Sequence, residues 1–200
     1  MKLLLGTTNS AKVADYTKFL QHAELEIVTL GQLGIIDEPL EIGQTFKENA
    51  LQKAKFYAGT TELPTLSDDG GFEVDFLDGR PGIDSNRWLG PNATDEDKIN
   101  KILELLQGVP EKQRSARLKA VTVVYFLDVN DYVSSENSTE GAIPSKASSR
   151  VIKNFPYRSL LFLPEYNKYY SELNQNELAK TDHRKQICKE LLLKIEPFLN

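Results

Sequence analysis

The chain has 200 residues, of which 40% are hydrophobic and 26% are charged, and its formal net charge is −5. This composition excludes a disordered chain, and an acidic balance without basic clusters argues against tight binding to a nucleic acid polymer. The length fits one domain, or one domain with two lobes, and the longest apolar runs are far shorter than the roughly 20 residues of a membrane span.

The first elements alternate between strand-like and helix-like patterns. A strand is predicted over 2–6, followed by a polar turn at 7–9 and a helix from about Ser10, which together make a βα unit. A second strand is predicted over 25–30. The segment 45–58 is predicted to be a helix because its apolar residues recur at helical spacing, at Phe46, Ala50, Ala54 and Tyr57.

The alternation continues to the end of the chain. We predict strands over 64–67 and 72–77, a helix over 94–107 capped by Thr94, a long strand over 118–129, a loop or hairpin over 130–150, short strands over 151–163, and a helix from about His183 to Phe198. The long strand has apolar residues in both alternating sets, which is typical of a central strand covered on both faces. The whole pattern predicts an α/β fold with a mixed sheet.

Cys188 is the single cysteine of the chain. One cysteine excludes an intramolecular disulfide and fits a reducing compartment, so we expect this thiol to serve packing and the protein to be cytoplasmic. Met1 and Lys2 lead straight into the first predicted strand, and therefore no signal peptide is expected.

Two adjacent acids, Asp68 and Asp69, end an apolar run and precede the glycine pair Gly70 and Gly71. Adjacent carboxylates repel each other, and either solvent or a bound metal relieves the repulsion; a metal would make Asp69 a ligand or a base. The alternative is an ordinary acidic turn, because Asp and Gly are common turn residues.

The turn of Thr7, Thr8 and Asn9 joins the first strand to the first helix. A helix that begins in this way presents backbone N–H groups and a positive dipole end to an anion. Lys12 lies in the first helical turn, where a cation is unfavourable, so it either points away or has an anionic partner such as a phosphate. The pattern is not a Walker loop, and a capped surface helix is the alternative.

Glu48 and Lys53 lie on the helix predicted after Thr45. Thr45 and Glu48 have the spacing of a capping box, which would explain Glu48 structurally. If Glu48 instead faces Asp69, the two carboxylates would suit Mg²⁺, which usually takes one or two protein carboxylates and completes its shell with water and phosphate oxygens.

Separated segments in the same order resemble one family, the inosine triphosphate pyrophosphatases, over nearly the whole chain. Thr7, Asn9 and Lys12 resemble its T-x-N-x-x-K motif, and EIGQTFKENALQKA at 41–54 is similar to its E-x-G-x-T-F-x-E-N-A helix. SDDGGFEVDFLDGRPGIDSNRW is similar to its central D-D-S-G-L segment, the stretch 94–117 resembles the helix and strand entry that follow, and Asp182, His183 and Arg184 fall where the family has S-H-R.

The resemblance implies hydrolysis of purine nucleoside triphosphates, such as those of inosine or xanthosine and their deoxy forms, to monophosphate and pyrophosphate with Mg²⁺. It implies that Asp69 is a metal ligand and proton acceptor, with Asp68 beside it, and that Glu48 is a metal ligand. The implied substrate-binding residues are Thr7, Thr8, Asn9, Lys12, Lys53, Gly70, Arg87, Phe155, Tyr157, Arg158, Asp182, His183 and Arg184. Because neighbouring side chains of an extended stretch point to opposite faces, only one of the two aspartates is expected to touch the metal, and Asp69 is our choice.

The departures from the family pattern cluster where the base should bind. FPYRS at 155–159 stands where the family has F-G-Y-D-P, so Arg158 replaces an aspartate, and Asp182 replaces the serine of S-H-R. Either Arg158 and Asp182 pair with each other, or Asp182 accepts hydrogen bonds from the N–H donors of a base. We therefore expect the phosphate chemistry to be retained and the base preference to be shifted or broadened.

The resemblance further implies one elongated domain over 1–200, with a central mixed sheet flanked by helices, two lobes with the site in the cleft between them, and a homodimer. The expected partner is a nucleoside triphosphate, with no nucleic acid polymer and no membrane. Two other functions stay open. One is a nucleotide-binding regulator that has lost turnover, and the intact motif residues argue against it: Thr7, Asn9, Lys12, Glu48 and Asp69. The other is a purely structural module that binds no triphosphate.

Overall fold

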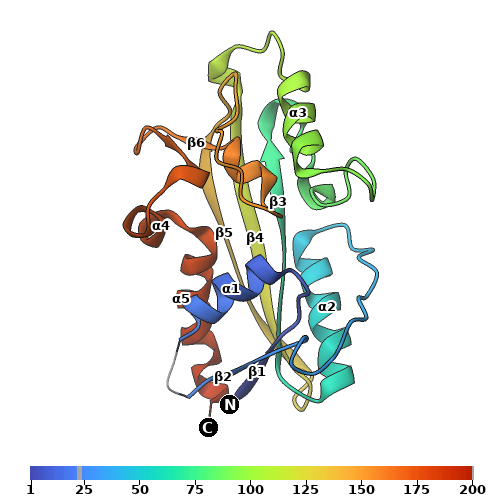
Figure 1. Cartoon of the computed structure of the whole chain (residues 1–200). Coiled ribbons are helices and arrows are strands. Elements are labelled where there is room, and N and C mark those ends of the chain that lie inside the picture. The colour runs from blue at the N-terminus through green and yellow to red at the C-terminus, as the bar shows by residue number, and fades with distance from the viewer. Residues whose placement is uncertain (22–23, 200) are drawn as a thin grey trace. The chain divides into compact units, whose positions relative to one another are not determined.

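The computed structural model describes residues 1–21 and 24–199, and in this part of the chain seven strands form one mixed sheet in the order β2-β1-β3-β4-β5-β6-β7 (Figure 1). The strands are β1 (Lys2–Leu5), β2 (Glu26–Thr29), β3 (Thr65–Val74), β4 (Ser115–Phe126), β5 (Asp131–Ala142), β6 (Phe162–Leu163) and β7 (Lys168–Tyr169). The helices are α1 (Ser10–Phe19), α2 (Phe46–Thr61), α3 (Asp95–Leu105), α4 (Gln175–Thr181) and α5 (His183–Ile195). β1 is parallel to β2 and β3, whereas β6 is antiparallel to β5 and β7. The predicted α/β class with a mixed sheet is confirmed.

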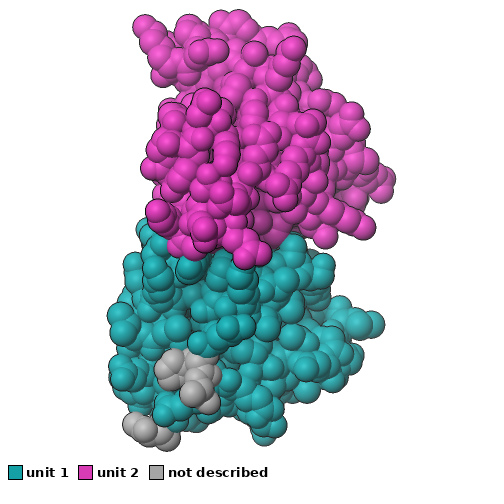
Figure 2. All heavy atoms as spheres, turned by 60° about the vertical axis from the view of Figure 1, so that its left-hand side comes forward, with its two compact units in different colours: residues 1–69, 120–137, 183–200 teal, residues 70–119, 138–182 magenta. Residues whose placement is uncertain are grey.

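The chain divides into two compact units, which Figure 2 shows in different colours. The first unit consists of Met1–Asp69, Ala120–Asn137 and His183–Asn200, and the second consists of Gly70–Lys119 and Ser138–Asp182. No helix of the described residues is both long and apolar enough to cross a membrane.

Alternation along the strands builds the core of the first unit on two faces of its sheet (Figure 1). Leu3 and Leu5 of β1 pack in one cluster with α1 and α5, whereas Leu4 packs with Tyr57 of α2. The same division occurs in β4, where Val124 packs toward α1 and α5 and its neighbours toward α2. Both faces of these strands are therefore covered by helices, as the apolar run in the sequence predicts.

The second unit has its own core around α3 and the parts of β3 and β4 that belong to it. Ile99 and Ile102 of α3 are buried there, and the rings of Phe72 and Tyr157 stack with centroids 5.0 Å apart. The predicted helix with a Thr94 cap is confirmed, because Thr94 and Asp97 form a complete capping box.

The remaining helix predictions are also confirmed. α2 begins after the Thr45 cap, buries its predicted apolar residues and runs three residues past Ala58. α5 begins at His183 and buries Ile187, Leu191 and Ile195, which recur at helical spacing, and the thiol of Cys188 is buried next to Ile187 in the sequence. A last 3₁₀ turn, Glu196–Phe198, completes the predicted C-terminal segment.

The structure corrects the predicted strands between 64 and 77. One continuous strand, β3, runs through Asp68, Asp69 and both glycines, so the alternative of an acidic turn is wrong. Gly71 is small for a packing reason, because a Cβ atom built on it would lie 2.2 Å from the carbonyl oxygen of Gly82. A glycine within a strand commonly marks such a close approach of two backbone segments.

Two further segments differ from their predictions. The polar stretch 130–150, predicted as a loop or hairpin, contains the single long strand β5 next to β4, so that prediction is wrong for residues 131–142. The short strands predicted over 151–163 reduce to β6, and a 3₁₀ turn, Pro156–Ser159, precedes it. α4 was not predicted, although its Asn174 cap and Glu177 form a capping box that the sequence displays.

Candidate active site

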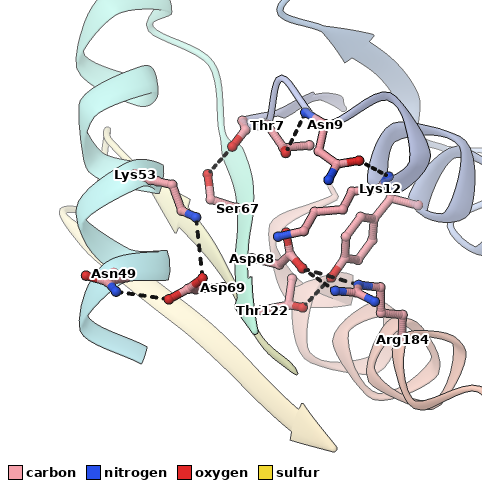
Figure 3. A network of polar contacts seen from close by, with 12 residues as sticks. Thr7, Asn9, Lys12, Asn49, Lys53, Ser67, Asp68, Asp69, Thr122 and Arg184 are labelled. Carbon is pink, nitrogen blue, oxygen red and sulfur yellow. Dashed lines mark hydrogen bonds and ion pairs between the residues drawn. The ribbon is translucent and has the colours of Figure 1, made fainter. Parts of the chain in front are cut away.

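Asp68 lies at the centre of a buried ion-pair cluster in the first unit (Figure 3). It is 1% exposed, and its Oδ1 atom lies 2.9 Å from the Nζ atom of Lys12 on α1. Nε and Nη2 of Arg184, near the start of α5, both lie 3.3 Å from Asp68 Oδ2. The carboxylate of Asp68 is thus held by cations from two helices on one face of the sheet.

The electrostatics of this cluster favour an ionised Asp68. Burial by itself raises the pKa of a carboxyl group, but Lys12, Arg184 and Lys53 outweigh burial and hold the pKa of Asp68 well below its ordinary value. Burial lowers the pKa of Lys12 despite its contact with Asp68. Asp68 is therefore a permanent anion that fixes two cations, which is unsuitable for accepting a proton near neutral pH.

Asp69 points to the opposite face of β3 and has different partners (Figure 3). Its Oδ2 atom accepts a hydrogen bond of 3.0 Å from Asn49 Nδ2 on α2, and its Oδ1 atom lies 3.9 Å from Lys53 Nζ. The ammonium of Lys53 is closer to another acid, at 2.5 Å from Glu41 Oε1. Asp69 therefore shares a nearby cation, Lys53, with Glu41, whereas Asp68 lies close to two cations of its own.

The pKa of Asp69 shifts in the other direction. Burial raises the pKa of Asp69 above its ordinary value, against the opposing attraction of Lys53 and Lys12. Although burial opposes it, the combined attraction of Asp69, Asp68 and Glu41 raises the pKa of Lys53 above its ordinary value. Of the two neighbouring acids, Asp69 has the environment of a general base or a cation ligand.

The predicted phosphate-binding turn caps its own helix. Asn9 Oδ1 accepts hydrogen bonds from the backbone N–H groups of Ala11 and Lys12, at 3.0 and 3.2 Å. The Thr7 hydroxyl accepts a bond from the Asn9 N–H, and the Thr8 hydroxyl donates to the carboxylate of Glu38. Asn9 thus already satisfies two first-turn amides, which agrees with the alternative of a capped helix for this turn.

Glu48 has a capping role in this structure. Its backbone N–H donates to the Thr45 hydroxyl, and its Oε2 atom accepts a hydrogen bond of 2.7 Å from the Gln44 N–H. The predicted box is therefore shifted by one residue, because the carboxylate reaches Gln44 rather than Thr45. Among the described residues, no group of three or more His, Cys, Asp and Glu side chains is placed to hold a metal ion.

Glu41 is a candidate residue that the sequence reasoning did not single out. It lies in the segment before α2, and the contact of its carboxylate with Lys53 brings it into the same cluster as Asp69. The E-x-G spacing before the helix was visible in the sequence, but only the tertiary structure shows which acid reaches this cluster.

The residues predicted to bind the base fall mainly in the second unit. The guanidinium of Arg158 lies over the ring of Phe155, 3.8 Å from its centroid, and 5.3 Å from that of Tyr170. Asp182 is 3% exposed and accepts a hydrogen bond of 2.7 Å from the Tyr170 hydroxyl. Arg158 and Asp182 therefore both contact Tyr170, and Arg158 also contacts the ring of Phe155.

The other predicted residues have structural contacts of their own. The Tyr157 hydroxyl donates to the Ser85 carbonyl oxygen, and Arg87 makes an exposed ion pair of 2.9 Å with Asp84. Gly70 lies within β3. His183 is buried at the start of α5, with Nε2 3.3 Å from Arg184 Nη1, so the predicted His-Arg pair turns toward Asp68.

The protein is thus an α/β protein in which two acids of β3 each lie beside a lysine of a neighbouring helix. In α/β proteins, polar ligands commonly bind where such groups gather at the sheet. The chain belongs to the Ham1 family, whose family model matches residues 3–194. The resemblance deduced from the sequence motifs is thereby confirmed.

Individual relatives agree with the family assignment. The chain is 38% identical over 193 residues to a dITP/XTP pyrophosphatase of Escherichia coli O157:H7, covering 96% of each chain. It is 35% identical over 196 residues to the dITP/XTP pyrophosphatase of Vibrio cholerae serotype O1, covering 98% of this chain and 96% of that protein. The solved structure of a HAM1 protein from Coxiella burnetii is similar with a TM-score of 0.87 and 28% identity, covering 98% of each chain.

Proposed function

We propose that this chain is an enzyme that hydrolyses non-standard purine nucleoside triphosphates to the monophosphate and pyrophosphate. The observation that carries the proposal is the separation of Asp68 and Asp69 onto two faces of β3, with a lysine beside each. The relatives named dITP/XTP pyrophosphatase support the substrate class. Phosphoryl chemistry needs mainly positioning and neutralisation of charge, and this cluster can provide both.

In the proposed reaction, Asp69 accepts a proton from a water molecule whose oxygen forms a bond to the α-phosphorus. The bond between the α-phosphorus and the oxygen that bridges to the β-phosphorus breaks, and pyrophosphate leaves. Lys12 and Lys53 neutralise charge on the phosphate oxygens, with Thr7, Thr8 and Asn9 at the turn beside them. Asp68 stays ionised and keeps Lys12 and Arg184 in place.

The proposal includes Mg²⁺ because two carboxylates of the first unit, those of Glu41 and Asp69, already lie on either side of a cation, the ammonium of Lys53. The Lys53 ammonium lies against both Glu41 and Asp69, so the local donor set suits positive charge. A divalent ion held by Asp69 and a nearby glutamate would polarise phosphate oxygens and lower the pKa of a bound water. The sequence motif assigns Glu48 to this role, whereas the contact with Lys53 favours Glu41.

The two glutamates can be distinguished by calorimetric titration of the protein with Mg²⁺ in the absence of nucleotide. If Glu41 is the ligand, Glu41→Gln should weaken Mg²⁺ binding by about 10-fold or more, whereas Glu48→Gln should change it little. The opposite ranking would restore the sequence assignment of Glu48.

The base preference is proposed to be broader than that of inosine and xanthosine triphosphates alone. Arg158 brings guanidinium donors, which can bind the O6 and N7 acceptors of guanine and other 6-oxopurines, to a place where the family pattern has an acid. Asp182 can accept from N–H donors of a base. Release of pyrophosphate should be compared for inosine, xanthosine, guanosine and pyrimidine triphosphates, both ribo and deoxy; a profile restricted to the first two would refute the broadening.

The decisive experiment measures pyrophosphate and orthophosphate separately, with Mg²⁺, for the intact chain and for Asp69→Asn. Pyrophosphate release that falls by orders of magnitude in the variant supports the proposed base. Near-normal release by Asp69→Asn refutes it. Tight nucleotide binding without hydrolysis by the intact chain would instead support a regulatory protein.

The proposal also includes a cytoplasmic homodimer. Support for a reducing compartment comes from the buried free thiol of Cys188. The oligomeric state rests on the family resemblance alone, and light scattering of the purified chain measures it directly.

A further inference from the structure

Asn49 is the fully buried polar residue that joins Asp69 to the segment in front of α2. It is 0% exposed, although it lies in the first turn of a helix whose neighbouring residues Lys47 and Glu48 are exposed. Its Nδ2 atom donates to Asp69 Oδ2 at 3.0 Å, and its Oδ1 atom accepts from the Gly43 N–H at 2.8 Å. The nitrogen of the Asn49 amide is therefore bonded to β3, and its oxygen is bonded to the segment before α2.

These two hydrogen bonds complete a closed ring of contacts. From Asp69 the ring passes through Lys53 to Glu41, along the backbone to Gly43, and through Asn49 back to Asp69. Gly43 is tightly packed in this ring, since a Cβ atom built on it would lie 2.6 Å from Asn49 Oδ1. The position of the Asn49 amide is thus fixed from three directions: by its helix, by Gly43 and by Asp69.

An amide is the appropriate group at this place. It donates to a carboxylate without adding or removing charge, and it orients one carboxylate oxygen while the second, Oδ1, faces Lys53. A lysine here would give Asp69 a second close cation, as Asp68 has. An acid here would place two carboxylates against each other.

We propose that Asn49 is the positioning residue of this active site: it fixes the orientation of the Asp69 carboxylate and couples it to the segment that bears Glu41. The inference rests on the proposed function, because it assigns Asn49 to act through Asp69. Asn49 makes no contact with the phosphate-binding turn among the contacts that the structure describes, so its effect belongs to turnover and not to substrate affinity.

The test is a double-mutant cycle of Asn49→Asp with Asp69→Asn, scored by pyrophosphate release. Asn49→Asp keeps an acceptor for the Gly43 N–H, but it loses the donor to Asp69 and places a negative charge beside that carboxylate. In the wild-type background it should lower kcat by about 10- to 100-fold, the usual effect of losing a supporting hydrogen bond, with KM changed by less than about threefold. In the Asp69→Asn background it should change the residual kcat by less than about threefold, because the group through which it acts is already gone.

A merely structural asparagine would give a different result. If Asn49→Asp lowers kcat by the same factor in both backgrounds, or raises KM as much as it lowers kcat, the inference is overturned. Lys55→Gln is the matched control, because it makes the same change of one charge unit from an exposed position on the same helix. It should leave kcat unchanged.

A second variant keeps the test decisive if Asn49→Asp folds poorly. Gly43→Ala changes no polar group but displaces the Asn49 amide, and it should lower kcat by about 10-fold with little change in KM; wild-type kcat would refute the coupling to Asp69. The same measurements distinguish failure of the proposed base, Asp69, from failure of the positioning role of Asn49. Full activity of Asp69→Asn refutes the proposed base, whereas an inactive Asp69→Asn with equal effects of Asn49→Asp in both backgrounds refutes the positioning role alone.

Discussion

Replacing Asp68 by asparagine should destabilise the protein far more than the same change at Asp69. Asp68→Asn leaves the shape of the side chain nearly unchanged and removes its charge. Lys12 and Arg184 then remain in the interior without their common counterion, with side-chain exposures of only 15% and 6%. Truncation of a buried ion pair is severe for this reason.

The magnitude follows from the distances. Two unit charges about 3 Å apart interact by roughly 5 kcal/mol at an effective dielectric constant of about 20. Desolvation of the groups offsets part of this attraction, and breaking a buried pair typically costs about 3–5 kcal/mol. For a chain of this size about 1 kcal/mol corresponds to 2–4 °C, so Tm should fall by roughly 6–20 °C.

Asp69→Asn is the matched control for this prediction. Because burial raises the pKa of Asp69, the fold does not favour its charge, and neutralising it should change the free energy of unfolding by less than about 1 kcal/mol. Urea unfolding followed by far-UV circular dichroism measures both variants without any nucleotide. A loss below about 1 kcal/mol for Asp68→Asn, or equal losses for the two variants, would refute the division of roles.

Two further predictions concern pH and packing. The pKa of Asp68 is lower in the folded chain than in the unfolded one, so its stabilisation is present above about pH 4 and is lost as the pH falls through the folded pKa. The difference in unfolding free energy between wild type and Asp68→Asn should therefore be constant from pH 7 to 5 and shrink at pH 3; a constant difference at all three values contradicts this reasoning. Gly71→Ala should cost about 1–3 kcal/mol in urea unfolding because its Cβ atom would overlap the Gly82 carbonyl, whereas Gly59→Ala, with open space around it, should be neutral or stabilising.

The helices and the central strand could be predicted because local pattern and tertiary environment agree there. α2 and α5 have apolar residues at helical spacing, and those residues are buried. β3 was divided in error because the sequence Asp-Asp-Gly-Gly has the composition of a turn. Pairing within the sheet outweighed that local preference, which is the usual reason for such errors.

β5 illustrates a second limit. Its sequence, DYVSSENSTEGA, is polar, and only two of its residues are buried, Ser135 and Thr139. Neither alternation nor an apolar run marks the strand, so its extent is decided by its neighbours in the sheet.

The candidate site was only partly visible in the sequence for a related reason. The motifs identified Lys12, Lys53 and the two aspartates, but not which side chains touch. Arg184, expected at the base, contacts Asp68 from 116 residues away. Asn49 and Glu41 can be identified as site residues only from the structure, because their contacts depend on how α2 and the segment before it pack against β3. Sequence spacing reports the residue types of a site, whereas contacts between distant segments are a property of the fold.

The two aspartates show how backbone geometry alone can give identical neighbours different chemistry. Side chains alternate along a strand, so Asp68 must face the side covered by α1 and α5, and Asp69 the side covered by α2. The first side supplies two cations, Lys12 and Arg184, which keep the Asp68 carboxylate ionised. The second side supplies the neutral amide of Asn49 and a shared lysine, which leave the Asp69 carboxylate able to accept a proton. A shift of the β3 register by one residue would turn each of the two acids to the opposite face of the strand, away from the partners that give it its chemistry.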